Sequence, residues 1–206
     1  MKKEDNFYIT LYCSIAKGKL HLNGELLYEN DNSDFKEFIK EVYKQQGGKY
    51  AKFFKMDNLS KLAFLASDVL LMNENLNSEE NDIAIVFSNN ASSLDTDRKH
   101  QKSIQNKDDY YPSPAVFVYT LPNICIGEIS IKHKLYSENS FFIFDTFNAE
   151  KLHAYANSLL LNNKAEQVLC GWVNYDEDTY EAFLYLVSKK GTKTHSIKEI
   201  ITLYTT

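Results

Sequence analysis

The stretch Glu138-Asn-Ser-Phe-Phe-Ile-Phe-Asp-Thr-Phe-Asn-Ala-Glu150 decides the fold, because it places a strand, a turn and the start of a helix in direct succession. Residues 141–144 are all apolar and predict a strand, which runs into Asp145 and Thr146 and then into a helical pattern. Many enzymes present a nucleophile on a strand–turn–helix of this kind. Covalent catalysis would need a Cys or Ser here, whereas the turn carries Phe147 and Asn148. The sequence therefore predicts an elbow without a nucleophile.

The composition of the 206-residue chain predicts one globular domain, residues 1–206. Hydrophobic residues make up 44% and aromatic residues 14%, enough for a sizeable core, and only 7 Gly and 3 Pro argue against long disordered stretches. The net charge is -5 and the lysines are scattered, so the chain lacks the basic patch that binds nucleic acid. We therefore expect no nucleic-acid partner.

The sequence pattern also argues against targeting, membrane and cofactor sites. Residues 1–6 are too polar for a signal peptide, and no stretch approaches the ~20 apolar residues that span a bilayer, so we expect a cytoplasmic protein without membrane contact. Cys13, Cys125 and Cys170 are widely spaced and odd in number, which predicts buried thiols and no disulfide. The histidines lack paired ligand spacing, so no metal and no cofactor is expected.

Apolar runs predict four further strands besides the strand of the elbow. Residues 7–15 predict a first strand, followed by a hairpin-like turn region at 17–24. Residues 83–87 are continuously apolar, which is typical of a strand covered on both faces. Residues 168–173 and 182–187 predict two antiparallel strands joined by an acidic turn. Together these segments make a five-stranded sheet.

Helical periodicity fills the intervals between the strands. Helices are expected at 35–43, at 59–70, from about 121 onward and at 152–160. Asn32, Ser33 and Asp34 offer caps for the first helix, whereas residues 91–112 are polar and charged and predict a long exposed connection. The order β-α-β-α-β-α-β-β, with an extra small helix near the start, predicts an α/β fold with a mixed sheet and helices on both faces.

Four stretches resemble the N-terminal half of a β-ketoacyl synthase. In chain order they are Met56-Asp57-Asn58-Leu59-Ser60-Lys61-Leu62-Ala63-Phe64-Leu65-Ala66, the segment 82–94, Ser113-Pro114-Ala-Val-Phe117-Val-Tyr119-Thr120-Leu121-Pro122-Asn123-Ile-Cys-Ile-Gly127-Glu128-Ile129, and Val168-Leu-Cys-Gly171-Trp-Val. They are similar to the family's M-D-x-x-S-x-L-A-x-x-A helix start, its second strand, its SP-x-x-F-x-x-T-L-P-N-x-x-x-G-x-I segment and its V-L-A-G-G strand. The likeness covers roughly residues 56–175.

The resemblance implies a thiolase-like fold of which this chain is one half. The family's elbow reads D-T-A-C-S-S, so Asp145 and Thr146 match while the catalytic cysteine falls on Phe147 or Asn148. The family's catalytic histidines belong to a C-terminal half that this chain lacks. The chain thus resembles the small cysteine-less chain-length-factor type. This implies a non-catalytic subunit paired with a catalytic β-ketoacyl synthase in fatty acid or polyketide biosynthesis, for example of polyene or resorcinol pigments.

The resemblance also implies where a partner and an acyl chain would lie. In thiolase-like proteins the strand before the elbow is an edge strand that pairs with its counterpart in the partner, which implies an interface of Phe141, Phe142, Ile143 and Phe144. The tunnel-lining candidates are Phe117, Tyr119, Leu121 and Phe147. A single half is expected to leave apolar surface for its partner. Acyl carrier protein is expected to dock mainly on that partner.

The sequence leaves several alternatives open. The strand at 141–144 is also compatible with the interior of an ordinary monomer, and the candidate tunnel residues are compatible with core aromatics that touch no ligand. The assembly is either a heterodimer or a self-dimer. Two other functions are a binding or scaffold protein that keeps the fold without acyl chemistry, and a divergent acyltransferase that uses another group near the elbow.

Overall fold

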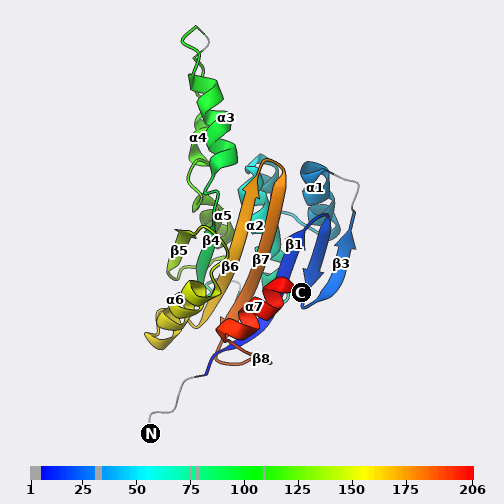
Figure 1. Ribbon diagram of the computed structural model, residues 1–206, viewed down its shortest axis with the longest axis vertical. Coiled ribbons are helices and arrows are strands. Elements are labelled where there is room, and N and C mark those ends of the chain that lie inside the picture. Colours follow the sequence, from blue (N-terminus) through cyan, green and yellow to red (C-terminus); the bar gives the residue numbers. More distant parts are fainter. Residues whose placement is uncertain (1–5, 31–33, 75, 78, 109) are drawn as a thin grey trace.

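One mixed sheet of eight strands organises the chain (Figure 1). The computed structural model describes residues 6–30, 34–74, 76–77, 79–108 and 110–206, so residues 1–5, Asn32 and Ser33 lie outside the described residues. The strand order is β3 (Glu25–Glu29), β2 (Lys19–Leu22), β1 (Tyr8–Ala16), β7 (Thr179–Ser188), β6 (Gln167–Asp176), β4 (Ile83–Asn89) and β5 (Asn139–Ile143), with β8 (Lys193–Thr194) paired to β1. β4 runs parallel to β5 and β6, and the other pairs are antiparallel.

The α/β class and the mixed sheet are confirmed, but the predicted number of five strands is wrong. The region 17–24, expected as a turn, contains β2 between two tight turns. Lys17 and Gly18 have φ of 49° and 72°, and Asn23 and Gly24 have φ of 53° and 84°. Such left-handed pairs form two-residue hairpin turns. They leave only 4 residues for β2, too few for an alternating pattern to stand out.

Helices cover both faces of the sheet, as predicted (Figure 1). They are α1 (Phe35–Gln45), the short 3-10 helix η1 (Ala51–Lys55), α2 (Asn58–Leu71), α3 (Leu94–Ile104), α4 (Pro114–Val118), α5 (Ile124–His133), α6 (Ala149–Leu161) and α7 (Ile197–Thr205). Asp34 caps α1 and Asp57 caps α2, each accepting a backbone N–H three residues on at 2.9 Å. None of the described helices is long and apolar enough to cross a membrane.

The prediction of a long connection without a helix at 91–112 is wrong, because the helix α3 forms there. With α4 it projects from the body as an arm (Figure 1). Asp95 and Asp97 lie in the first turn of α3, where acidic side chains favour a helix start. Of the residues of α3, only Thr96 is buried. A helix with a single buried residue has no apolar stripe, so periodicity could not reveal it.

Two hydrophobic cores lie on opposite faces of the sheet. The first contains α1, η1, α2 and α5, and the second contains α6 and α7. Every residue of α2 except Lys61 is buried. The rings of Tyr43 and Phe53 stack 3.8 Å apart, and both contact Phe64 of α2. The chain therefore covers this helix by itself, and any apolar surface left for a partner must lie elsewhere.

Small residues are buried in the sheet and in the helix α5 that packs on it. The predicted burial of Cys13, Cys125 and Cys170 is confirmed, and all three are free thiols. β6 and β7 pair antiparallel, as predicted. Gly171 of β6 has φ 155°, and a Cβ there would overlap the backbone of Phe183 in β7. Only glycine fits this close approach of two strands.

Candidate functional site

The predicted elbow is present as a strand, a bend and a helix. β5 passes into α6 through residues 144–148. Asn148 caps α6, because its Oδ1 accepts a hydrogen bond from the backbone N–H of Lys151 at 2.9 Å. The φ of Asn148 is -125°, which is ordinary backbone, so this bend lacks the strained turn that exposes a nucleophile. Asp145 and Thr146 are exposed and take no part in a hydrogen-bonded catalytic arrangement with described residues.

An aromatic cluster fills the space behind the bend. The ring of Phe147 stacks on Tyr204 of α7 with 4.0 Å between ring centroids, and it meets Trp172 and Phe183 edge-on. The hydroxyl of Tyr204 donates to Glu181 at 3.0 Å. Burial and this carboxylate raise the pKa of Tyr204 to about 12, so it stays a neutral donor. Of the two positions onto which the family's cysteine can fall, Phe147 thus carries a packed phenyl ring and Asn148 caps α6.

Sequence reasoning missed Tyr204 because it assigned no element after Ser188. The helix α7 that carries Tyr204 begins with a clear cap. The hydroxyl of Ser196 accepts a hydrogen bond from the backbone N–H of Glu199 at 3.2 Å. A serine followed three residues later by a glutamate is the capping-box pattern. This pattern, together with the apolar residues that follow, could have located α7.

β5 lies at the edge of the sheet, where the resemblance places it. It pairs with β4 and with no other described strand. The backbone N–H of Phe144 donates to Asn89 of β4 at 2.9 Å. Backbone groups alternate between the two sides of a strand, so Phe142 also faces β4 while the N–H of Ile143 faces the free edge. The side chain of Ile143 is 51% exposed.

The three phenylalanines of the strand before the elbow are half-buried, and they pack on both faces of the sheet. Phe141 packs against the first core, and Phe142 and Phe144 pack against the second. The ring of Phe142 stacks on Phe144 at 5.7 Å and meets Tyr155 of α6 edge-on at 5.0 Å. The strand is therefore packed on both faces, although one row of its backbone groups has no partner among the described strands.

Large exposed apolar side chains gather on the elements that precede β5. They lie on α4, on α5 and on the segments that lead from α4 to α5 and from α5 to β5. Their exposed fractions range from 46% to 69%, and with Ile143 they are Phe117, Val118, Leu121, Ile131 and Tyr136. We call this set the β5-side apolar group. Apolar surface of this kind on a folded chain typically marks an interaction site.

The structure does not bring the tunnel-lining candidates together. Phe117 and Leu121 are exposed at 59% and 55%. Tyr119 is buried in the first core, where its hydroxyl lies 3.4 Å from Glu128, and burial followed by this carboxylate raises its pKa. Phe147 packs against the second core, on the other face of the sheet. Only Phe117 and Leu121 are therefore free to reach another molecule without rearrangement.

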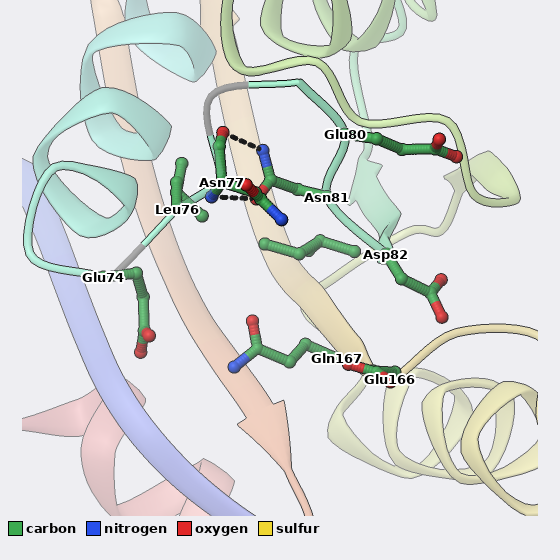
Figure 2. Close-up of a pocket in the computed structure, with 9 residues that line it drawn as sticks. Glu74, Leu76, Asn77, Glu80, Asn81, Asp82, Glu166 and Gln167 are labelled. Carbon is green, nitrogen blue, oxygen red and sulfur yellow. Dashed lines mark hydrogen bonds between the residues drawn. The ribbon is translucent and has the colours of Figure 1, made fainter.

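A polar pocket of about 430 Å³ lies away from the elbow (Figure 2). Its carboxylates are Glu74, Glu80, Asp82 and Glu166. Figure 2 shows Asn81 hydrogen-bonded to Asn77, whose backbone N–H donates to Asn81 Oδ1 at 2.6 Å. The pocket flanks the N-terminal ends of β4 and β6, whereas the elbow follows the C-terminal end of β5, which is parallel to β4. Among the described residues, no group of three or more His, Cys, Asp or Glu side chains is placed to hold a metal ion.

No family model and no curated protein matches this chain. Solved structures match well in fold at low identity. A chain of the ishigamide ketosynthase/chain length factor has 16% identity and a TM-score of 0.65, with 89% of this chain and 62% of that chain covered. A chain of the ketosynthase ApeO in complex with its chain length factor ApeC, from Xenorhabdus doucetiae, has 14% identity and a TM-score of 0.61, with 97% and 90% covered.

A third structure agrees with these two. It is a chain of AntDE:AntF, a type II polyketide synthase acyl-carrier protein in complex with its ketosynthase, with 13% identity, a TM-score of 0.63, and 89% of this chain and 62% of that chain covered. This chain thus spans 62% of the length of the first and third matches. At such identities the likeness establishes the fold alone, and this chain has the fold of the matched parts of these ketosynthase and chain-length-factor structures.

Proposed function

We propose that this protein is a non-catalytic, chain-length-factor-like subunit that pairs with a catalytic β-ketoacyl synthase. The observation that carries the proposal is the elbow, which keeps its strand, bend and helix but holds Phe147 in an aromatic cluster. Neither a thiol nor a strained turn is present to accept an acyl group. A chain with this fold and this elbow can support acyl chemistry only through another subunit.

The second support is the free edge of β5. An edge strand with an outward row of backbone groups is a template for pairing with a strand of another chain. The β5-side apolar group lies on elements and segments that lead up to β5 in the chain, and we propose that the interface buries its members as well. Phe141, Phe142, Ile143 and Phe144 would then form the centre of the interface.

The compared structures favour a heterodimer over a self-dimer. Two of the three structures are of a ketosynthase with a chain length factor, and one of these two is a complex of the pair. In that complex the matched chain is covered over 90% of its length, so it is similar to this chain in size. A short chain of this fold thus has a counterpart in a ketosynthase complex. By this proposal the assembly forms in the cytoplasm, with acyl carrier protein docking mainly on the catalytic subunit.

Within the pair, Phe117 and Leu121 are the side chains proposed to meet the partner's acyl cavity. Both are more than half exposed and both belong to the β5-side apolar group. Bulky side chains at the end of a cavity limit the length of the chain it can hold. Tyr119 and Phe147 were candidates on the sequence, but by this proposal they act as packing residues.

The test is co-expression with each ketosynthase of the same organism, followed by native mass measurement. We expect a one-to-one complex with one of them and no condensation activity of this chain alone. Ile143→Pro removes a backbone donor that faces the free edge while leaving the bond from Phe144 to Asn89 in place. It should abolish the complex and leave the chain folded. A chain that stays monomeric with every ketosynthase would favour the scaffold function instead.

A further inference from the structure

The turn between β2 and β3 consists of Asn23 and Gly24, the only Asn-Gly pair in the sequence. Both residues are exposed, and their φ angles of 53° and 84° are those of a type I′ turn. An asparagine side chain can react with the backbone nitrogen of the next residue, and a glycine there carries no side chain that shields this nitrogen. The pair therefore combines an exposed amide with an accessible nucleophile.

Tyr12 of β1 holds the side chain of Asn23 in place. The backbone C=O of Tyr12 accepts a hydrogen bond from the backbone N–H of Asn23 at 2.8 Å, and the backbone N–H of Tyr12 donates to Asn23 Oδ1 at 3.0 Å. The side-chain amide thus extends the ladder between β1 and β2 beyond the pair Cys13 and Leu22. A donor directed at Oδ1 stabilises negative charge that develops on this oxygen, as the donors of an oxyanion hole do.

The peptide unit between Asn23 and Gly24 is free to turn over. Neither the C=O of Asn23 nor the N–H of Gly24 makes a hydrogen bond to a described residue. Turning this unit over converts the type I′ turn into a type II′ turn, in which φ of the second residue is negative, and glycine accepts both signs of φ. In the type II′ turn the ψ of Asn23 is about -120°, which brings the nitrogen of Gly24 onto the side of Asn23 Cβ.

We propose that Asn23 and Gly24 form a self-modifying site, at which the folded chain converts Asn23 into aspartate and isoaspartate. The backbone nitrogen of Gly24 forms a bond to Cγ of Asn23. The bond from Cγ to Nδ2 breaks, and Nδ2 leaves as ammonia with the proton of the Gly24 nitrogen. Water then opens the five-membered imide, at Cγ to give aspartate or at the main-chain carbonyl to give isoaspartate. Because both reacting groups lie in adjacent residues, ring closure is intramolecular.

Isoaspartate changes the hairpin more than aspartate does. Aspartate keeps a side-chain oxygen opposite the N–H of Tyr12, whereas isoaspartate carries the main chain through Cβ and Cγ and lengthens the turn by one carbon. Turn length fixes the register of a hairpin, and β3 pairs with β2 and with no other described strand. Formation of isoaspartate therefore loosens β3. The proposal does not rest on the proposed function, because the reaction needs this chain and water alone.

The test follows residue 23 by peptide mass spectrometry while the full chain is kept folded at pH 8. Replacement of the amide changes the mass, and enzymatic methylation of the free α-carboxylate identifies isoaspartate. The matched control is Lys164→Gly, which places a glycine after Asn163. Asn163 also has a left-handed φ, of 51°, but the N–H of residue 164 donates to the C=O of Leu159 at 2.9 Å, so this peptide unit is tied down. In this variant Asn163 should convert roughly fivefold to tenfold more slowly than Asn23, the factor for one hydrogen bond that must break.

Two results would overturn the proposal. One is that Asn23 stays intact in the folded chain, and the other is that Asn23 and Asn163 convert at the same rate in the folded variant. If Lys164→Gly fails to fold, the unaltered chain decides by itself, because conversion in buffer supports the proposal and conversion confined to urea contradicts it. Hydrogen exchange provides a second readout. Exchange in β3 should be faster after modification, and unchanged exchange there would contradict the effect on the hairpin.

Discussion

The two edges of the sheet are built differently although both expose apolar side chains. At one edge, β3 has the sequence Glu-Leu-Leu-Tyr-Glu, with a glutamate at each end, and Lys19 of β2 pairs with Glu29 at 2.7 Å. Tyr28 ties this edge to α1 by donating to Glu41 at 2.6 Å. At the other edge, β5 has the sequence Asn-Ser-Phe-Phe-Ile, without a charge.

The difference shows which edge is protected. Charged side chains on an edge strand oppose pairing with another chain, because pairing would bury them. β3 carries such residues at both ends and β5 carries none. Leu26 on β3 and Ile143 on β5 are equally exposed, at 50% and 51%, so exposure of one side chain does not separate the edges. What separates the two edges is the charge pattern of their strands.

The largest expected effect comes from placing a charge on the open edge. Ile143→Lys should weaken the complex with the ketosynthase at least about a hundredfold, because pairing would bury an unpaired ammonium. Leu26→Lys is the matched control, since the original side chains are equally exposed and the new charge lies on the protected edge. Native mass and binding titration measure both. Equal loss from the two variants would mean that the edges do not differ in function.

The next largest effect is expected on stability, from removing the aromatic ring that packs behind the bend between β5 and α6. Phe147→Ala should lower the free energy of unfolding by about 2–3 kcal/mol, somewhat below the usual cost for a fully buried phenylalanine because its ring is only half-buried. It removes the stack on Tyr204 and loosens the link from β5 to α6. Urea unfolding measures the change.

Phe117→Ala is the contrasting variant for Phe147→Ala. Phe117 is 59% exposed, so its removal should change stability by less than about 0.5 kcal/mol. In the complex it should instead alter product length, which is read by mass spectrometry of the products. A product distribution that stays the same in an intact complex would leave Phe117 with an interface role only.

Acid should lower the stability of the folded chain through His195, which packs against α6. His195 is 5% exposed, with Nδ1 2.9 Å from Asn157 of α6. Burial, and then the nearby His153, lowers its pKa from 6.5 to about 3. Between these values the unfolded chain binds a proton that the folded chain does not, so stability falls as pH falls, by up to about 1.4 kcal/mol per pH unit.

Urea unfolding between pH 7 and pH 4 tests this dependence on His195. The free energy of unfolding of His195→Gln should fall less steeply with decreasing pH than that of the unaltered chain. Hydrogen exchange at pH 4.5 should then speed up in α6 and β5 before β3. A slope that is the same in both chains would assign acid sensitivity to other groups.

Much of the fold was predictable because its cues are local. The caps at Asp34 and Asp57, the one-sided pattern of α2 and the continuous apolar run in β4 were each contained within a few residues. The strand, bend and helix of the elbow were predictable for the same reason. Prediction failed for β2 and α3, because one is too short to show alternation and the other has no buried face.

The sequence by itself determined that the elbow has no Cys or Ser nucleophile, because Phe147 and Asn148 lack a thiol or hydroxyl in any fold. Only the tertiary structure decided that β5 is an edge, because that depends on which strands hydrogen-bond and not on the residues of β5. It also decided that Tyr119 and Phe147 lie in different cores, and that Asp68 meets His133. Contacts between distant segments arise from packing, which periodicity along one segment does not encode.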